Sequence, residues 1–225
     1  MIHYSTSIYP PNIKWEIKKE PVYRLLNKVE YINNFFETGE IMVSCFSKFK
    51  EYKDEMQGDK DEGEAMAWYM DSQGNVEAVK YASGINAFIL STAKTLNDRV
   101  KNDFKSEGAI KINNSTMFGY ELCKQLPFVS SGIEGLCDYT DSRVRHINTD
   151  LSRKDKSGIF DFNNESDYSR MILEQSTKGF ELFNKLEKYS HQEEYRFVWF
   201  SENQITNSIK INCPEAIKYC EKIIF

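Results

Sequence analysis

The sequence of 225 residues contains no apolar run of about 18 residues, the length that a helix needs to cross a bilayer. Its first residues also lack a basic segment followed by an apolar one, so we expect neither a secretory signal nor a membrane partner. We find no internal repeat and no tract of low complexity. These absences predict a cytoplasmic protein, and the length of 225 residues, long for one domain and short for two, predicts that residues 1–225 form a single domain.

Cysteine is scarce and has no pairing pattern. The five cysteines are an odd number, and no two of them form a C-x-x-C pair. We therefore expect reduced, mostly buried thiols in a reducing compartment. Only three histidines are present to complete a zinc site, so we expect no metal. The residues concerned are Cys45, Cys123, Cys137, Cys213 and Cys220, with His3, His146 and His191.

An excess of basic charge is also missing. A net charge of -5 argues against a protein that grips nucleic acid by bulk electrostatics, although a local basic groove is compatible with it. The basic run within 141–156 is typical of a solvated face, or it could follow a phosphate backbone. The acidic stretch 53–64 lacks the ligand order of a calcium-binding EF-hand, which favours a solvated or substrate-flanking loop.

Aromatic residues, by contrast, are abundant: 13 Tyr and 15 Phe favour a substantial sheet. Apolar and alternating patterns predict strands at 22–26, 40–46, 65–81 (a hairpin), 85–92, 135–140 and 207–212. Helical spacing predicts helices at 28–37, 96–104, 115–126 and 167–189, and Pro214 begins a further turn. Strands outnumber long helices and mostly lack helical crossovers. We therefore predict an α+β domain with a central split, mainly antiparallel sheet flanked by helices.

The most informative stretch is 191–200, where a charged turn runs into an aromatic, β-branched segment. Period two predicts a strand with an aromatic face and a polar face: Tyr195, Phe197 and Trp199 against Gln192, Glu194 and Arg196. Such crowding of polar groups at a strand start points to a functional site. Alternatively, Glu194 and Arg196 form a surface ion pair worth less than about 1 kcal/mol.

Two other predicted strands carry polar groups in unusual places. Arg24 interrupts the apolar strand 22–26, so its guanidinium must meet an anion or reach solvent. Ser91 and Thr92 follow the four apolar residues 87–90 and place two hydroxyls at a strand exit. Those hydroxyls could hold a ligand amide, or they could cap the helix predicted at 96–104.

Taken in chain order, these residues resemble a known pattern. Arg24, Ser91-Thr92 and Gln192-x-Glu194 resemble the Arg, Ser-Thr-Ser and [Gln/Glu]-x-Glu elements of the R-S-E class of ADP-ribosyltransferases. Ala93 stands where the third residue of Ser-Thr-Ser would be, and Ser44-Cys45-Phe46-Ser47 is a competing candidate for that strand. The ending Glu-Glu-Tyr-Arg-Phe-Val also resembles bacterial toxin and antiphage proteins, among them the CmdT-type transferases that modify messenger RNA.

The resemblance implies NAD as substrate and no metal. Glu194 would stabilise the positive charge that develops on the ribose, and Gln192 would orient the acceptor. Arg24 would bind the NAD phosphates or the adjoining ribose, and Ser91 with Thr92 would hold the nicotinamide end. The implied partners are a macromolecular acceptor, RNA or protein, and an antitoxin protein.

Two other classes of function fit the same residues. One is a different effector enzyme, an NAD glycohydrolase or a nuclease, that uses the same carboxylates. The other is a non-catalytic sensor or partner-binding module, in which the pair Glu194–Arg196 is structural and the acidic loop meets a basic partner. Fold analogy cannot separate these classes, because function depends on the site.

Overall fold

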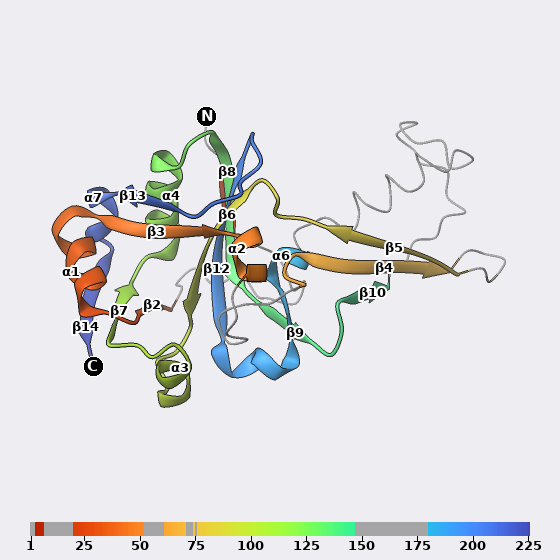
Figure 1. Cartoon of the computed structure of the whole chain (residues 1–225), viewed down its shortest axis with the longest axis horizontal. Helices are drawn as coiled ribbons and strands as arrows, with labels where there is room; N and C mark the ends of the chain where they lie inside the picture. The colour runs from red at the N-terminus through yellow and green to blue at the C-terminus, as the bar shows by residue number, and fades with distance from the viewer. Residues whose placement is uncertain (1–2, 7–19, 52–60, 71–73, 75, 147–179) are drawn as a thin grey trace.

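The computed structural model describes residues 3–6, 20–51, 61–70, 74, 76–146 and 180–225. These residues form a mixed α+β fold in which most strand pairs are antiparallel (Figure 1). The α+β class and the predominance of antiparallel pairing agree with the prediction from sequence. No helix of the described residues is long and apolar enough to span a membrane.

The main sheet is built around strand β12. Its strand order is β1-β8-β12-β6-β2-β7-β14, and β3 adds to β6 and carries β13. The bounds are β1 His3–Thr6, β2 Val22–Leu26, β3 Glu40–Cys45, β6 Ala87–Ala93, β7 Gly108–Ile112, β8 Val129–Leu136, β12 Glu194–Ser201, β13 Ile209–Asn212 and β14 Cys220–Ile224. Strand β1 runs parallel to β8, whereas β12 is antiparallel to both β8 and β6.

The sheet divides along one edge of β6. Tyr23 of β2 pairs with Ala93 at one end of that edge, whereas Ser44 and Cys45 of β3 pair with Ile89 and Phe88 further back. Strands β2 and β3 therefore leave β6 in different places. The short stretch of β6 between these two ladders faces the gap between the two branches.

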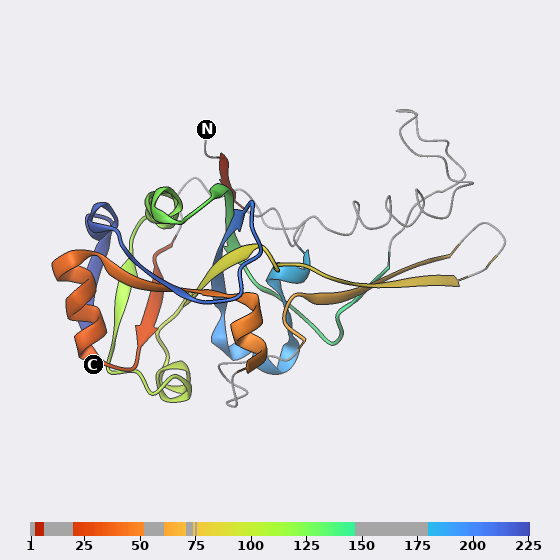
Figure 2. The ribbon, with the colours of Figure 1, turned by 45° about the horizontal axis from the view of Figure 1, so that its top comes forward.

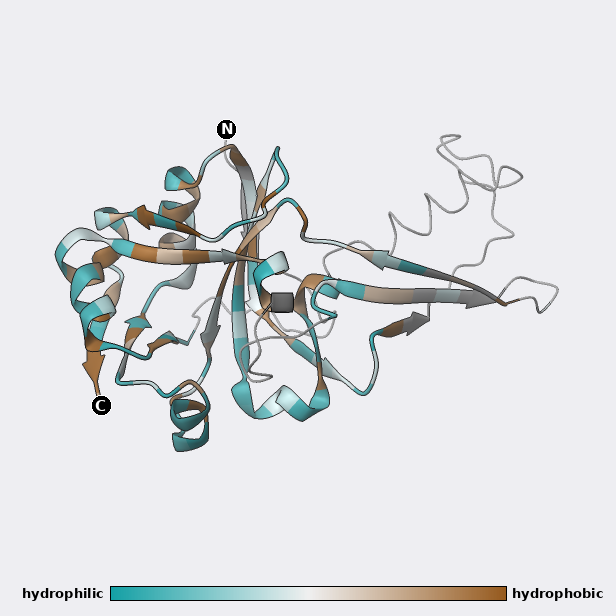
Figure 3. Cartoon of the chain, viewed as in Figure 1, coloured by the Kyte–Doolittle hydropathy of each residue, from teal (hydrophilic) through white to brown (hydrophobic). Residues whose placement is uncertain are grey.

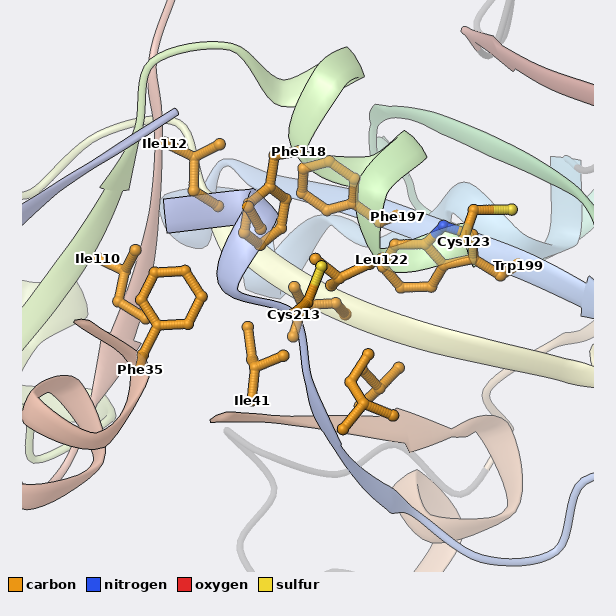
Figure 4. Close-up of a cluster of buried hydrophobic side chains, with 14 of the residues drawn as sticks. Phe35, Ile41, Ile110, Ile112, Phe118, Leu122, Cys123, Phe197, Trp199 and Cys213 are labelled. Carbon is orange, nitrogen blue, oxygen red and sulfur yellow. The ribbon is translucent and has the colours of Figure 1, made fainter. Parts of the chain in front are cut away.

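Three helices cover one face of the sheet and close the larger core: α1 (Val29–Thr38), α4 (Ser115–Gln125) and α7 (Pro214–Ile217). Figure 4 shows this core, where the rings of Phe118 and Phe197 lie 5.5 Å apart. Helix α1 ends at Gly39, whose φ of 76° is the left-handed value that favours glycine. A Cβ there would also lie 2.3 Å from the backbone of Cys213, so only glycine fits.

The other face carries a smaller apolar cluster. Helices α2 (Phe46–Glu51) and α6 (Phe180–Phe183) contribute to it against β6 and β12. Its buried members are Phe46, Ala87, Ile89, Leu182, Phe183 and Val198. Helix α3 (Asp98–Asp103) and the 3₁₀ helix η1 (Glu187–Gln192) lie at one end of the sheet and are mostly hydrophilic (Figure 3).

Beside this body, a second sheet extends as an arm (Figures 1 and 2). It consists of β4 (Glu64–Met70) and β5 (Val76–Ala82), which form the hairpin predicted at 65–81, together with β10 (Val144–His146). A two-stranded parallel sheet, β9 (Asp138–Thr140) with β11 (Asn184–Leu186), lies between the body and the arm.

Several sequence predictions need correction. Of the helix predicted at 167–189, residues 180–183 are helical as α6, but β11 and η1 replace it from residue 184 onward; residues 167–179 lie outside the described residues. Strand β7 was missed altogether, and Phe46 begins α2 rather than ending a strand. Most of the acidic stretch 53–64 and of the basic run 141–156 also lies outside the described residues.

The cysteines agree with their prediction. All five lie in described segments and are free thiols, of which Cys45, Cys123, Cys137 and Cys213 are buried. Burial raises the pKa of the Cys123 thiol to about 11, which makes its reactive thiolate scarce at neutral pH. These thiols therefore act as small apolar side chains of the core.

Candidate ligand-binding cavity

A cavity of about 440 Å³ opens where the sheet divides. Strands β2, β3, β6 and β12 line it together with η1. The structure brings to its wall all five residues that the sequence singled out: Arg24, Ser91, Thr92, Gln192 and Glu194. Its size lies within the range of pockets that bind small ligands and cofactors.

Glu194 opens strand β12 at the base of this cavity. Its Oε1 accepts a hydrogen bond from Nε of Arg196, and its Oε2 accepts one from Nζ of Lys185, each at 2.6 Å. Glu194 is 6% exposed and Arg196 is 1% exposed. The two residues therefore form a buried ion pair, and the alternative of a surface pair is wrong.

The ion pair belongs to a larger network. Nη1 of Arg196 lies 2.5 Å from Oε1 of Glu62 and donates to the carbonyl oxygen of Leu182 at 2.6 Å. Nζ of Lys185 also donates to Oε1 of Gln192 at 2.8 Å. Two carboxylates thus face two cations, and the network of Glu62, Lys185, Glu194 and Arg196 has no net charge. Such balance is what permits charges to be buried.

The network holds Glu194 in its ionised form. Burial by itself would raise the pKa of this carboxyl, but the attraction of Arg196 and Lys185 outweighs burial and holds the pKa well below its usual range. Burial likewise disfavours the ammonium of Lys185, yet the attraction of Glu194 raises its pKa above the ordinary value. At neutral pH the cavity therefore contains a carboxylate and an ammonium in direct contact.

The backbone around Glu194 is fixed by the turn before it. Glu193 has a φ of 40°, a left-handed value that is uncommon outside glycine, and the turn ends η1 there. The carboxylate of Glu193 accepts a hydrogen bond from the hydroxyl of Thr95, while the N–H of Glu194 donates to the Tyr139 hydroxyl at 2.7 Å. The period-two pattern predicted that Gln192 belongs to the strand. In the structure Gln192 instead reaches the cavity from the end of η1.

Arg24 and Ser91 meet across the gap in the sheet. Nη1 of Arg24 donates to the carbonyl oxygen of Ser91 at 2.8 Å, in the stretch of β6 that lies between the ladders to β2 and β3. Ser91 lies opposite Arg196 in the register, so the two side chains share one face of the sheet. Within the described part of the chain, the buried Oγ of Ser91 has no hydrogen-bond partner. A buried hydroxyl without a partner is costly, and a ligand in the cavity would supply one.

Thr92 differs from its neighbour. It lies opposite Tyr195, on the other face of the sheet, and its hydroxyl donates to the Tyr195 carbonyl at 2.7 Å. Neither Ser91 nor Thr92 caps the next helix, because Asn97 does so by accepting from the N–H of Val100 at 2.9 Å. The hydroxyl of Ser91 is thus the better placed of the two for a ligand.

The rim of the cavity combines charge with exposed apolar surface. Lys210 and Glu40 form an ion pair of 3.0 Å there, and the side chains of Tyr31 and Met42 are exposed beside it. An apolar wall with a few convergent polar groups is typical of sites for small organic ligands. No cluster of potential metal ligands exists among the residues that the structure describes.

Sequence reasoning missed Lys185 and Glu62. Lys185 lies within the helix predicted at 167–189, outside the apolar face on which that prediction rests, so its sequence provides no reason to expect a buried ammonium. Glu62 stands in an acidic stretch that reads as a solvated loop, yet it is 3% exposed. The one signal that could have found Glu62 is the buried Arg196, which requires a second carboxylate to balance Lys185.

We compared the chain with known protein families, curated proteins and solved structures. No protein-family profile matches the chain, and no curated protein or solved structure shows significant similarity to it. Any functional proposal therefore depends on the cavity and on the sequence pattern.

Proposed function

We propose that this protein is an NAD-dependent ADP-ribosyltransferase that modifies a macromolecule, RNA or protein. The observation that carries the proposal is the convergence of Arg24, Ser91 and Glu194 on one cavity. They come from three different strands, β2, β6 and β12, in the chain order of the R-S-E pattern. On this proposal the divided sheet is an ADP-ribosyltransferase-like fold, and NAD lies in the gap between its branches.

The chemistry explains why an ionised Glu194 is needed. Breaking the bond between nicotinamide and ribose leaves positive charge on the anomeric carbon and the ring oxygen, as in glycoside hydrolysis. A carboxylate offers about four lone-pair directions, of which Lys185 and Arg196 occupy two. Glu194 can therefore still accept a hydrogen bond from a ribose hydroxyl. The two cations weaken its field, so its contribution is a well-oriented acceptor more than a bare negative charge.

The other residues would each bind a different part of the dinucleotide. The guanidinium of Arg24 carries five donors in a planar fork, which suits a diphosphate. The Oγ of Ser91 would bind the nicotinamide end, and the backbone of Thr92 would shape that wall. Gln192 would face the acceptor, and it cannot act as a base, because an amide does not take up a proton at neutral pH. A role as a cytoplasmic toxin in antiphage defence, held in check by an antitoxin protein, follows from the resemblance alone.

A second candidate function is favoured by the same contacts. Both oxygens of Glu194 are already engaged, and Arg24 already donates to the Ser91 carbonyl. A non-catalytic module that senses a ligand would have such a preformed, internally bonded cavity. It would bind NAD without turnover, or it would not bind NAD.

One experiment separates these functions. The protein is incubated with NAD labelled in its adenylate half and with separate pools of total RNA, DNA and protein, while calorimetry measures NAD binding. Label in the RNA or protein pool is the expected result. Free ADP-ribose without label in any pool would indicate an NAD glycohydrolase, and cleaved nucleic acid without NAD consumption would indicate a nuclease. Intact NAD, bound or unbound, would overturn the transferase proposal, and intact NAD together with intact nucleic acid would favour the non-catalytic module.

A further inference from the structure

Lys185 links the two residues to which the proposed reaction assigns different tasks. Its Nζ lies 2.8 Å from Oε1 of Gln192 and 2.6 Å from Oε2 of Glu194. Lys185 is itself 7% exposed, and its ammonium lies 5.1 Å from the centroid of the Tyr189 ring. The ammonium is thus held on several sides, and it bridges the amide and the carboxylate.

The small sheet β9–β11 explains how Lys185 reaches this place. Lys185 of β11 pairs in register with Tyr139 of β9, and both residues contact Glu194. Tyr139 accepts from the backbone N–H of Glu194, while Lys185 donates to its carboxylate. A short pair of strands therefore fixes Glu194 at both its backbone and its side chain.

The bridge also fixes which end of the Gln192 amide faces Lys185. An ammonium has donors and no acceptor, so only the amide oxygen of Gln192 can point at it. The amide oxygen of Gln192 is therefore held at 2.8 Å from the Lys185 ammonium. The same ammonium cannot serve as a general base, because it keeps its proton at neutral pH.

We propose that Lys185 is a positioning residue that ties Gln192 to Glu194 and thereby sets how the acceptor is presented to the ribose. This inference rests on the proposed transferase function. Glu194 acts on the ribose and Gln192 on the acceptor, so the Lys185 bridge sets the distance between the two reacting partners. Loss of the bridge should impair transfer to the macromolecule more than attack by water, which needs no such alignment.

A purely structural role for Lys185 is the alternative to be tested. Without its charge, the network of Glu62, Glu194 and Arg196 would have a net charge of -1 in a buried site. Such a role predicts that any cation at position 185 restores the protein. A positioning role predicts that Lys185→Arg restores folding but not the partition of NAD between transfer and hydrolysis, because a guanidinium differs in length and shape from an ammonium.

The experiment compares Lys185→Met, Lys185→Arg and a matched control, Lys188→Met. Lys188 is three residues away and also lies against Tyr189, 4.8 Å from its ring centroid, but it is exposed. Transfer is measured to whichever pool, total RNA or total protein, takes label from NAD, and hydrolysis is measured as free ADP-ribose. We expect the ratio of transfer to hydrolysis to fall by up to about 10²-fold in Lys185→Met and in Lys185→Arg. It should not change in Lys188→Met.

Two further measurements test the link itself. Adding Gln192→Ala to Lys185→Met should lower the ratio no further, because Lys185 acts through Gln192. The side-chain amide resonances of Gln192 should shift in Lys185→Met and stay in place in Lys188→Met. This second readout does not depend on activity.

The failures are distinguishable. If the wild-type protein labels neither pool, the proposed function fails and this inference fails with it. If the wild type transfers ADP-ribose but Lys185→Met loses transfer and hydrolysis by the same factor, only the positioning role is overturned. Full recovery of the ratio in Lys185→Arg, or unmoved Gln192 resonances in Lys185→Met, would overturn it as well.

Discussion

Strand β12 buries two faces of opposite chemistry. Tyr195, Phe197 and Trp199 point into the larger core, whereas Glu194 and Arg196 point toward the cavity. Both faces are almost inaccessible, since Phe197 and Trp199 are 0% exposed and Arg196 is 1% exposed. One face of β12 is thus buried by apolar packing, and the other is buried because its charges balance.

The two faces of β12 differ in how strictly their contacts depend on geometry. Phe197 lies 5.6 Å from the ring of Tyr195 and 5.8 Å from that of Trp199, and such contacts tolerate small shifts. Arg196 instead needs Glu62, Leu182 and Glu194 at hydrogen-bonding distance. The apolar face should therefore be tolerant of substitution, and the charged face should be specific and sensitive to pH.

Breaking the charged face should produce the largest loss of stability. Arg196→Met removes the cation between Glu62 and Glu194 and leaves a buried excess of negative charge. We expect the free energy of unfolding to fall by about 3–5 kcal/mol near neutral pH. Urea unfolding followed by circular dichroism measures it.

The control for that variant is an exposed ion pair of the same kind. Lys210→Met breaks the pair with Glu40, in which the lysine side chain is 54% exposed, and should cost no more than about 1 kcal/mol. Equal losses in the two variants would mean that burial adds nothing to the Arg196 network.

The alternating pattern of β12 could thus be predicted from the sequence, but the residues that contact its charged face could not. The alternation in 194–200 depends only on neighbouring residues, and the structure has it. Glu62 reaches Arg196 from a turn far away in the sequence, and Lys185 reaches Glu194 from β11, which is a strand only through its pairing with β9. A buried lysine and a surface lysine look alike in sequence, because the contacts that distinguish them are non-local.

The same reason explains the errors in the fold. Strand β7 is short and follows a charged turn, so only its pairing with β2 and β14 makes it a strand. Periodic apolar residues near 180–189 suggested a helix, but pairing with β9 draws 184–186 into a strand. In both places tertiary contacts outweigh local preference. By contrast, α4 was predictable, because Asn114 caps it through the N–H of Met117 at 3.1 Å and its own sequence is amphipathic.

The next largest effect concerns turnover on the charged face. Glu194→Gln keeps the shape of the side chain but replaces one acceptor oxygen by an NH2 donor and removes the negative charge, so both the acceptor for the ribose hydroxyl and the charge that offsets the positive ribose are lost. We expect NAD binding near that of the wild type and turnover lower by about 10²-fold or more. Single-turnover NAD consumption, with calorimetry for binding, separates the two quantities.

Glu62→Gln is the matched control for that prediction. It neutralises a carboxylate that is equally buried and also bonded to Arg196, but that does not contact Lys185 or Gln192 in any hydrogen bond of the described structure. Glu62→Gln should lower turnover much less than Glu194→Gln does. Full transferase activity in Glu194→Gln would exclude the mechanism proposed here.

A smaller effect is expected at the opposite wall of the cavity. Arg24→Ala should weaken NAD binding by about ten- to a hundredfold, the amount that one or two hydrogen bonds to a charged group contribute. Arg24→Lys should restore it only in part, because an ammonium cannot reproduce the fork of a guanidinium. Calorimetry on variants with wild-type unfolding midpoints is the measurement. Unchanged affinity in a folded Arg24→Ala protein would remove this residue from the NAD site.

The smallest effect should come from the apolar face, and its pH dependence completes the comparison. Phe197→Leu keeps the core side chain apolar but removes the ring and three carbon atoms, so it should cost about 1–2 kcal/mol, less than the loss in Arg196→Met. Because Glu194 has a lowered pKa in the folded protein, its network contributes stability above the ordinary pKa of glutamate, and this contribution is lost as the pH falls toward the folded value. The loss of stability in Arg196→Met should therefore be largest near neutral pH and should shrink in acid. The loss in Phe197→Leu should stay constant over the same range, because its ring contacts involve no charge. Urea unfolding of both variants and of the wild type across the acid range gives the two difference curves. Parallel curves would show that the two faces of β12 are stabilised in the same way, and the contrast between packing and charge balance would then fail.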